Sequence, residues 1–290
     1  MDIKPNDLVL EIGSGNNPHP RANILCDRYL HDNSDRAGGF PAVVDRPFVV
    51  ADGQKLPFGD KQFDYVICSH ILEHIQNPER FIAEATRVGK RGCIEVPSIV
   101  SERIFGWDIH HWHIDRSGGR LRLWKKKEGE RFGGFFHRLI ANEIWFRRFF
   151  EEHESEWYVR FEWTNTIKYV ISKRGIPSEL LNAIDRKAWK RMSEAQPSFV
   201  DDLIFYCRWM MRRLVKKTIK TSRQLAWNIR VFISPKTLRS NLVTILLCPR
   251  CHGNLIDNAS RATVCKQCAT AYAFDGVIPI MILPGGRKGV

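Results

Sequence analysis

The stretch Val9-Leu10-Glu11-Ile12-Gly13-Ser14-Gly15 joins a short apolar run to a turn that contains two glycines. An apolar run of this length, closed by glycine, is typical of a strand buried on both faces of a sheet. Glycine allows the backbone to turn sharply and to approach a ligand, and open parallel sheets bind nucleotides at the carboxyl ends of their strands. A single Gly-x-Gly also fits an ordinary tight turn, so the motif needs support from residues further along the chain.

Further apolar runs occur at residues 23–26, 48–51, 63–68 and 92–96. Between the last two, Asn77-Pro78-Glu79 predicts the start of a helix, because Asn caps it, Pro fits its first turn and Glu suits its positive end. Strands that alternate with helical segments predict an α/β fold with a Rossmann-like, mainly parallel sheet covered on both faces.

The second half of the chain changes character. Residues 99–142 are rich in Trp, His and Gly and are expected to be irregular, whereas 143–152 are expected to be helical. Two β-rich runs flank Thr164-Asn165-Thr166 and predict a hairpin that ends the sheet with an antiparallel strand. We therefore predict three parts: an α/β domain at 1–175, a basic and mainly helical connector or lid at 176–240, and a small C-terminal domain at 241–290.

Two acidic residues close the second and third apolar runs. Asp27 stands where a carboxylate can accept both hydroxyls of a ribose. Asp52, followed by Gly53, can face the amino group of an adenine. Asp27 follows Gly15 by only twelve positions, against about 20 in the general dinucleotide pattern, so the helix after the first strand is short or missing. The ordered set predicts a nucleoside site at one edge of the sheet.

Three stretches together resemble the class I S-adenosylmethionine-dependent methyltransferases, especially the branch that acts on small molecules, quinones and sugars. They are residues 9–15, Val-Ala-Asp-Gly-Gln-Lys-Leu-Pro-Phe at 50–58, and Phe-Asp-Tyr-Val-Ile-Cys-Ser-His-Ile-Leu-Glu-His at 63–74. The last two stretches do not suit a dehydrogenase, the other class of enzyme that such a fold could represent. Asn17 stands where the family has a third glycine.

The resemblance covers residues 7–98 and implies a role for each motif residue. In that family the Gly13-Ser14-Gly15 loop would hold the methionine part of the cofactor, with Glu11 nearby. Asp27 would bind the ribose, and Asp52 with the backbone of Gly53 would frame the adenine. Ser69 and His70 would flank the sulfonium.

The residues after the fourth apolar run bear on the acceptor. The chain reads Cys68-Ser69-His70-Ile71 instead of the Asn-Pro-Pro-Tyr motif of relatives that methylate planar nitrogens. This favours an oxygen, carbon or aliphatic amine of a small molecule or glycan. His70 is one candidate base, and His111 in the Trp107–Asp115 stretch is another. That stretch could line the acceptor pocket, hold a metal through His111, His113 and Asp115, or simply pack over the sheet.

Four cysteines form two Cys-x-x-Cys pairs, at Cys248 and Cys251 and at Cys265 and Cys268. This pattern predicts one structural Zn²⁺ held by four thiolates. Residues 247–282 resemble the small zinc-ribbon activator proteins that pair with tRNA- and ribosome-modifying methyltransferases. The resemblance implies that the ribbon adds to the catalytic sheet and covers its apolar surface, here within one chain.

The basic charge is concentrated in one segment. Residues 186–240 hold fourteen Lys and Arg against three Asp and Glu, so they carry most of the net charge of +13. The segment, expected to be helical from 198 to 230, fits three interpretations: a solvated connector, a surface for anionic lipid or a lipid-linked substrate, and a phosphate-binding face for RNA.

The composition also bears on where the protein acts. No run approaches the ~18 uncharged apolar residues of a transmembrane helix, and paired cysteines indicate a reducing compartment, so we expect a cytoplasmic protein, with peripheral membrane attachment as one option. A lid over the cofactor would have to come from 99–142, from 176–240 or from a partner. An RNA- or translation-factor-directed methyltransferase and a non-catalytic scaffold stay open as alternatives.

Overall fold

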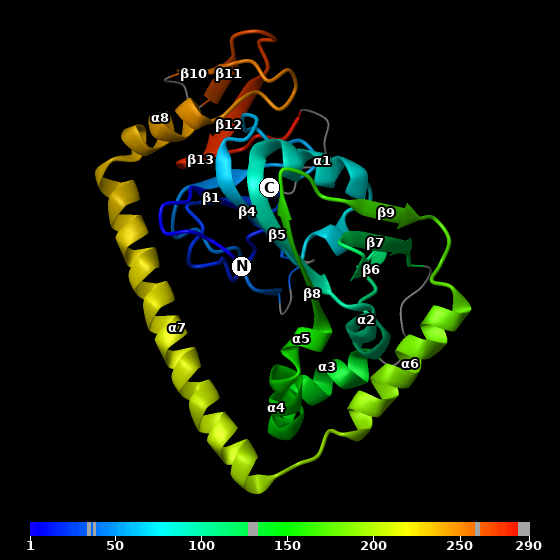
Figure 1. Cartoon of the computed structure of the whole chain (residues 1–290). Helices are drawn as coiled ribbons and strands as arrows, with labels where there is room; N and C mark the ends of the chain where they lie inside the picture. The colour runs from blue at the N-terminus through cyan, green and yellow to red at the C-terminus, as the bar shows by residue number, and fades with distance from the viewer. Residues whose placement is uncertain (34–35, 37–38, 127–132, 259–261, 284–290) are drawn as a thin grey trace.

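A computed structural model of the chain describes residues 1–33, 36, 39–126, 133–258 and 262–283 (Figure 1). Its centre is a six-stranded sheet in the order β3-β2-β1-β4-β5-β8. The first five of these strands run parallel, and β8 is antiparallel to β5. The strands are β1 (Val9–Ile12), β2 (Ile24–Asp27), β3 (Phe48–Val50), β4 (Phe63–Ser69), β5 (Gly89–Pro97) and β8 (Tyr158–Thr164). The expected mixed α/β fold with a mostly parallel sheet is confirmed.

Local sequence explains the elements around this sheet. Strands β1, β2 and β3 are buried along their whole length, as their apolar runs predict. Helix α1 (Pro78–Val88) crosses from β4 to β5, and the Asn77 side chain caps it by accepting a hydrogen bond from the Arg80 amide. Residues 13–23 contain no helix, which agrees with the short spacing between Gly15 and Asp27.

The region after β5 corrects two expectations. The described parts of this region, residues 99–126 and 133–142, are not irregular, because they hold α2 (Ile99–Phe105), β6 (Trp112–Ser117), β7 (Arg120–Lys125) and α3 (Gly133–Asn142). The predicted terminal hairpin is half wrong: β8 does end the central sheet, but β9 (Tyr169–Ser172) turns away and pairs in parallel with β7. There β9 completes a three-stranded sheet, β6-β7-β9, in which Leu121 and Leu123 are fully buried.

Four helices enclose a second apolar core, which includes Phe105, Phe146 and Trp157. They are α2, α4 (Ile144–Glu152), α5 (Glu154–Trp157) and α6 (Ser178–Ser193). Helix α7 (Phe199–Ile233) then runs along one side of the body and leads to α8 (Pro235–Ile245), as Figure 1 shows. No described helix is both long enough and apolar enough to cross a bilayer.

The cysteine-bearing segment joins the edge of the central sheet. Its four strands are β10 (Leu255–Asn258), β11 (Ala262–Cys265), β12 (Ala271–Asp275) and β13 (Ile278–Pro279). Just after β13, Ile280 forms a parallel bridge with Val50 on β3. Ile278, Ile280 and Ile282 pack on the apolar residues of β2 and β3. The C-terminal segment therefore extends the six-stranded sheet beyond β3.

Candidate functional site

The loop after β1 has a backbone that only glycine adopts readily. Gly13 has φ +74° and Gly15 has φ +51°. A Cβ on Gly13 would lie 2.7 Å from Cδ1 of Ile71, so the side chain beside β4 leaves no room for a larger residue. The Gly15 amide donates a hydrogen bond of 2.9 Å to Oδ2 of Asp27. The loop is thus tied to the end of β2, and two of the motifs meet at the carboxyl edge of the sheet.

Two buried polar groups lie at the start of this loop. The Ser14 hydroxyl oxygen is buried and has no hydrogen-bond partner among the described residues. Glu11 is buried too, and its Oε2 accepts a hydrogen bond of 2.7 Å from the His19 amide. Burial raises the pKa of Glu11 to about 8, because desolvation disfavours the carboxylate. Both groups could contact a polar ligand seated on the loop.

Arginines hold the two strand-end aspartates. Arg28 donates to Oδ2 of Asp52 over 2.5 Å, and the Gln54 amide donates to Oδ1 of the same residue. Arg36 lies 3.3 Å from Asp27. Both arginines were missed in the sequence, although Arg28 directly follows Asp27. Next to Asp52, Gly53 is packed so closely that a Cβ would lie 2.9 Å from the Phe81 ring.

His70 stands at the end of β4 in a strained backbone conformation. Its φ of +53° is rare for a residue with a side chain, and its amide donates to the Glu95 carbonyl oxygen. The ring contacts Tyr158 edge-on and lies 3.5 Å from Glu73 and 3.9 Å from Glu95. Packing around the ring disfavours its charged form, but the two carboxylates outweigh this and raise the pKa of His70. Ser69, the last residue of β4, lies beside it.

The other expected base, His111, is partly buried between α2 and β6. Its amide donates to the carbonyl oxygen of Glu73 over 2.7 Å, and its own carbonyl oxygen accepts from the Lys126 amide. Burial lowers the pKa of the neighbouring His113 to about 4, so that ring is neutral at pH 7. His111, His113 and Asp115, one of the alternatives for this stretch, do not form a metal grouping; of the described residues, Glu73, His74 and His110 come together here instead.

A cleft opens beside Tyr158, between α7 and the segment formed by α4 and α5. Its volume is about 700 Å³. Tyr158, whose ring contacts His70, is part of its lining, together with Arg208, Arg212 and Lys216 of α7. Acidic residues, among them Glu151 and Glu154, share the lining. The sequence did not predict this cleft, because α4 and α7 are remote in the chain.

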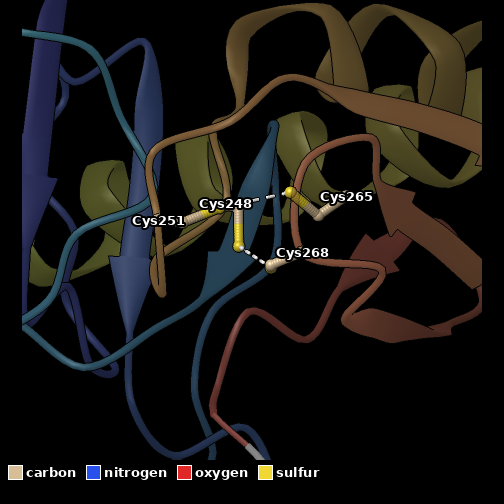
Figure 2. Close-up of side chains that lie close together, drawn as sticks. All are labelled: Cys248, Cys251, Cys265 and Cys268. Atoms are coloured by element: carbon tan, nitrogen blue, oxygen red, sulfur yellow. Dashed lines mark hydrogen bonds between the residues drawn. The ribbon is translucent and has the colours of Figure 1, made fainter.

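The four cysteines converge from two loops, as Figure 2 shows. Sγ of Cys248 is 3.7 Å from that of Cys268, and Sγ of Cys251 is 3.4 Å from that of Cys265. In a tetrahedral zinc shell with Zn–S bonds of about 2.3 Å, the sulfur atoms are roughly 3.8 Å apart. The Tyr272 hydroxyl and the Thr270 hydroxyl lie within 3.2 Å of Cys248 and Cys268. The cluster therefore has the dimensions of a four-thiolate metal site.

Comparison with known sequences matches residues 28–95 to a family model described as a methyltransferase domain. An uncharacterised protein of Methanocaldococcus jannaschii is 46% identical over 57 residues, which are 20% of this chain and 28% of that protein. The demethylmenaquinone methyltransferase of Streptomyces griseus is 29% identical over 96 residues, or 32% of this chain and 42% of that enzyme. The chain thus covers less than half the length of these relatives.

Two solved structures are also similar in part. One is an S-adenosylmethionine-dependent methyltransferase of Thermotoga maritima, a possible histamine N-methyltransferase, with 15% identity, TM-score 0.27, and coverage of 64% of this chain and 65% of that one. The other is a complex between a methyltransferase activator and a methyltransferase of Haloferax volcanii, with 20% identity, TM-score 0.25, and coverage of 34% and 48%. Residues 28–95 of this chain therefore match a methyltransferase domain.

Proposed function

We propose that this chain is an S-adenosylmethionine-dependent methyltransferase whose acceptor is a small molecule or a glycan. The observation that carries the proposal is the contact between Gly15 and Asp27, which brings the glycine loop and the ribose-type carboxylate to one edge of the sheet. Asp52 and Gly53 lie at the same edge and would frame the adenine. The unpartnered Ser14 hydroxyl and the buried Glu11 suit the polar end of the methionine part.

S-adenosylmethionine supplies an activated methyl group when bound, and transfer is an in-line displacement that depends chiefly on positioning. If the acceptor is a hydroxyl, its proton must leave, and His70 would take it at the end of β4. Glu73 and Glu95 flank the ring and would stabilise the imidazolium that forms. Tyr158 packs on the same ring and lines the cleft, so the acceptor would reach His70 past this tyrosine.

Calorimetry tests the cofactor half of this proposal. We expect the zinc-loaded protein to bind both S-adenosylmethionine and S-adenosylhomocysteine, and Asp27→Asn to weaken both by tenfold or more because a carboxylate accepts ribose hydroxyls better than an amide does. Absence of binding to the wild-type protein would overturn the enzymatic proposal. A screen of glycans and small alcohols with methyl-labelled cofactor would then identify the acceptor.

The cysteine cluster supports a structural Zn²⁺ as a second part of the proposal. Four thiolates at these separations would fill a tetrahedral shell and leave no position for catalysis. The ion would stabilise a small module that shares its core with the sheet, since Cys248, Cys265 and Tyr272 pack in the same apolar cluster as Leu56 and Phe58.

Helix α7 supports a partner of defined chemistry, an anionic membrane surface. Ten of its apolar side chains are each at least half exposed, and at 100° per residue they fall within a sector of roughly 160°. They are Phe199, Val200, Leu203, Met211, Leu214, Val215, Leu225, Ile229, Phe232 and Ile233. The buried apolar residues Phe205 and Trp227 lie on the opposite side of the helix, so this apolar stripe points away from the body.

Basic residues flank the apolar stripe on both sides. On the helical wheel Arg208 and Arg212 lie at one border and Lys217 at the other. An exposed apolar face bordered by Lys and Arg is the pattern of helices that lie in a membrane interface and attract anionic lipids. The same borders would repel a second copy of α7, which makes a membrane the better occupant.

The position of α7 connects this surface to the proposed chemistry. Lys220 donates to the Asn16 carbonyl oxygen over 3.3 Å, and Gln224 donates to that of Val44 over 2.8 Å. The helix therefore runs beside the cofactor loop while it lines the cleft near Tyr158. On a membrane this arrangement would present the cleft to a lipid-linked glycan, which we propose as the acceptor class.

A further inference from the structure

A carboxylate without a hydrogen bond is buried next to the end of β4. Glu73, in the short 3-10 helix η2 (Leu72–His74), is 1% exposed, and neither of its carboxylate oxygens has a hydrogen-bond partner among the described residues. Nδ1 of His70 approaches Oε1 only to 3.5 Å. An unsatisfied buried carboxylate is strongly disfavoured unless another group compensates its charge. Its placement calls for a cation.

Two imidazoles share the space in front of Glu73. His74 follows it in η2, and His110 comes from the loop between α2 and β6, with the two rings in edge-to-face contact at 4.6 Å. One atom from each of the three side chains lies within 4.8 Å of the other two. In a zinc shell with bonds of 2.0–2.2 Å, ligand atoms are roughly 3.4 Å apart, so these three need to approach by at most about 1.4 Å.

The surroundings of His110 resemble the outer shell of a metal ligand. Its Nδ1 is hydrogen-bonded to Oε1 of the fully buried Glu102, so Nε2 would be the atom that binds a metal. Lys126 is bonded to the other oxygen of Glu102 over 2.8 Å and holds it in place. Histidine ligands commonly donate their second ring N–H to a carboxylate, which fixes the ring and makes it a stronger ligand.

We propose that Glu73, His74 and His110 bind a divalent transition-metal ion, distinct from the ion of the four cysteines. Two imidazoles and one carboxylate suit Zn²⁺, Fe²⁺ or Mn²⁺ and leave at least one coordination position open. Glu73 and His110 are buried, whereas His74 is partly exposed. The open position is therefore on the His74 side, where a water molecule or an acceptor oxygen would occupy it.

The ion would also fix one wall of the candidate site. The loop that carries His110 is already attached at η2, because the His111 amide donates to the backbone carbonyl oxygen of Glu73 and the Trp112 indole donates to that of Ile75. A metal bridge between Glu73 and His110 would lock this loop against the end of β4, where His70 stands. The proposal rests on the cluster alone and does not depend on methyl transfer.

Metal content measures the site directly. The full chain is loaded with Zn²⁺, desalted and analysed by mass spectrometry for zinc per chain. We expect about two equivalents in the wild type, one on the thiolates and one on the new cluster, and about one in Glu73→Gln and in His110→Asn. His113→Asn, which removes a neighbouring histidine outside the cluster, should retain both.

X-ray absorption at the zinc edge tests the same site in the wild type, so the test remains valid even if a variant fails to fold. Two sites predict an average shell of about half sulfur and half nitrogen or oxygen. A shell of sulfur alone, a single zinc equivalent in the wild type, or two equivalents in Glu73→Gln and His110→Asn would each overturn the proposal.

Discussion

The amide of Met281 donates a hydrogen bond of 2.7 Å to the carbonyl oxygen of Val50, across the boundary between the cysteine-bearing segment and the central sheet. Met281 is buried in the same apolar cluster as Leu56 and Phe58. Leu247, at the other end of this segment, donates in turn to the Pro57 carbonyl oxygen. The two parts therefore share backbone pairing and a core, and they should unfold together.

Loss of the thiolate metal is therefore expected to destabilise the whole chain. Cys265→Ser should lower the free energy of unfolding by at least about 3 kcal/mol, because metal binding contributes directly to folding. Scanning calorimetry should show one transition at a lower temperature. Cys207→Ser, at an exposed cysteine of α7, is the matched control and should leave the transition in place. A sheet transition that stays unchanged after zinc removal would contradict this coupling.

Gly13→Ala should weaken cofactor binding strongly, while the protein still folds. The new methyl group meets both a positive φ and the Ile71 side chain, so the loop must move away from its ligand-facing position. We expect affinity for S-adenosylhomocysteine to fall at least tenfold by calorimetry, which is about 1.4 kcal/mol.

Gly118→Ala provides the control for that experiment. Gly118 also has a positive φ, but a Cβ there would meet nothing within 4 Å, and it lies in the β6–β7 turn. Equal losses of affinity in both variants would mean that backbone strain alone, and not the cofactor loop, accounts for the effect.

Stability should depend on pH through Glu11. Its pKa in the folded protein, about 8, lies above its ordinary value of 4.5 because of burial. The stabilising contribution is complete below pH 4.5 and is lost as the pH rises to about 8, by up to roughly 1.4 kcal/mol per pH unit. Denaturant unfolding of the wild type and Glu11→Gln between pH 5 and pH 8.5 should show that the variant loses less stability. Parallel curves would show that Glu11 does not titrate in this range.

Membrane binding by α7 should require its apolar stripe. Leu214→Glu with Leu225→Glu should reduce co-sedimentation with phosphatidylserine vesicles at least tenfold, because each leucine contributes about 1.5–3 kcal/mol when buried. Val170→Glu, at an exposed apolar position on β9, should bind as the wild type does.

The lipid headgroup and an RNA competitor complete that test. Neutral phosphatidylcholine vesicles should bind more weakly than anionic ones, and added salt should weaken binding to the anionic vesicles. Retention of bulk tRNA on filters, together with no binding to either vesicle, would instead favour RNA as the partner of α7.

The sequence predicted the central sheet well because its strands are mostly apolar runs, and Gly13, Asp27 and Asp52 mark the ends of the first three. It missed β6 and β7, where Leu121 and Leu123 alternate with arginines in a short segment after Gly118 and Gly119. It predicted the run that forms β9, but placed it in a hairpin with β8 instead of beside β7. The parallel pairing of β7 with β9 joins strands that are distant in the chain. No local pattern encodes such a partner, and the Thr164–Thr166 turn suggested the wrong one.

The candidate site, too, could be predicted from the sequence only in part. Motif residues such as Gly15 and Asp27 could be identified because they are fixed to strand ends. The groups that hold them in place, Arg28 and Arg36, could not be identified, because their contacts depend on loop conformation. Likewise, adjacent histidines at positions 110 and 111 look equivalent in the sequence, and only the fold turns His110 toward Glu73 and Glu102.

The segment that pairs with the outer edge of β3 is synthesised long after β3 itself. During synthesis the edge of β3, with Val50, stays bare until residues 278–282 leave the ribosome, because their backbone completes it. A bare strand edge invites pairing with other chains, and such long-range contacts form slowly. The nascent N-terminal half should therefore depend on chaperones, and truncations before the last strands should aggregate instead of folding into a smaller domain.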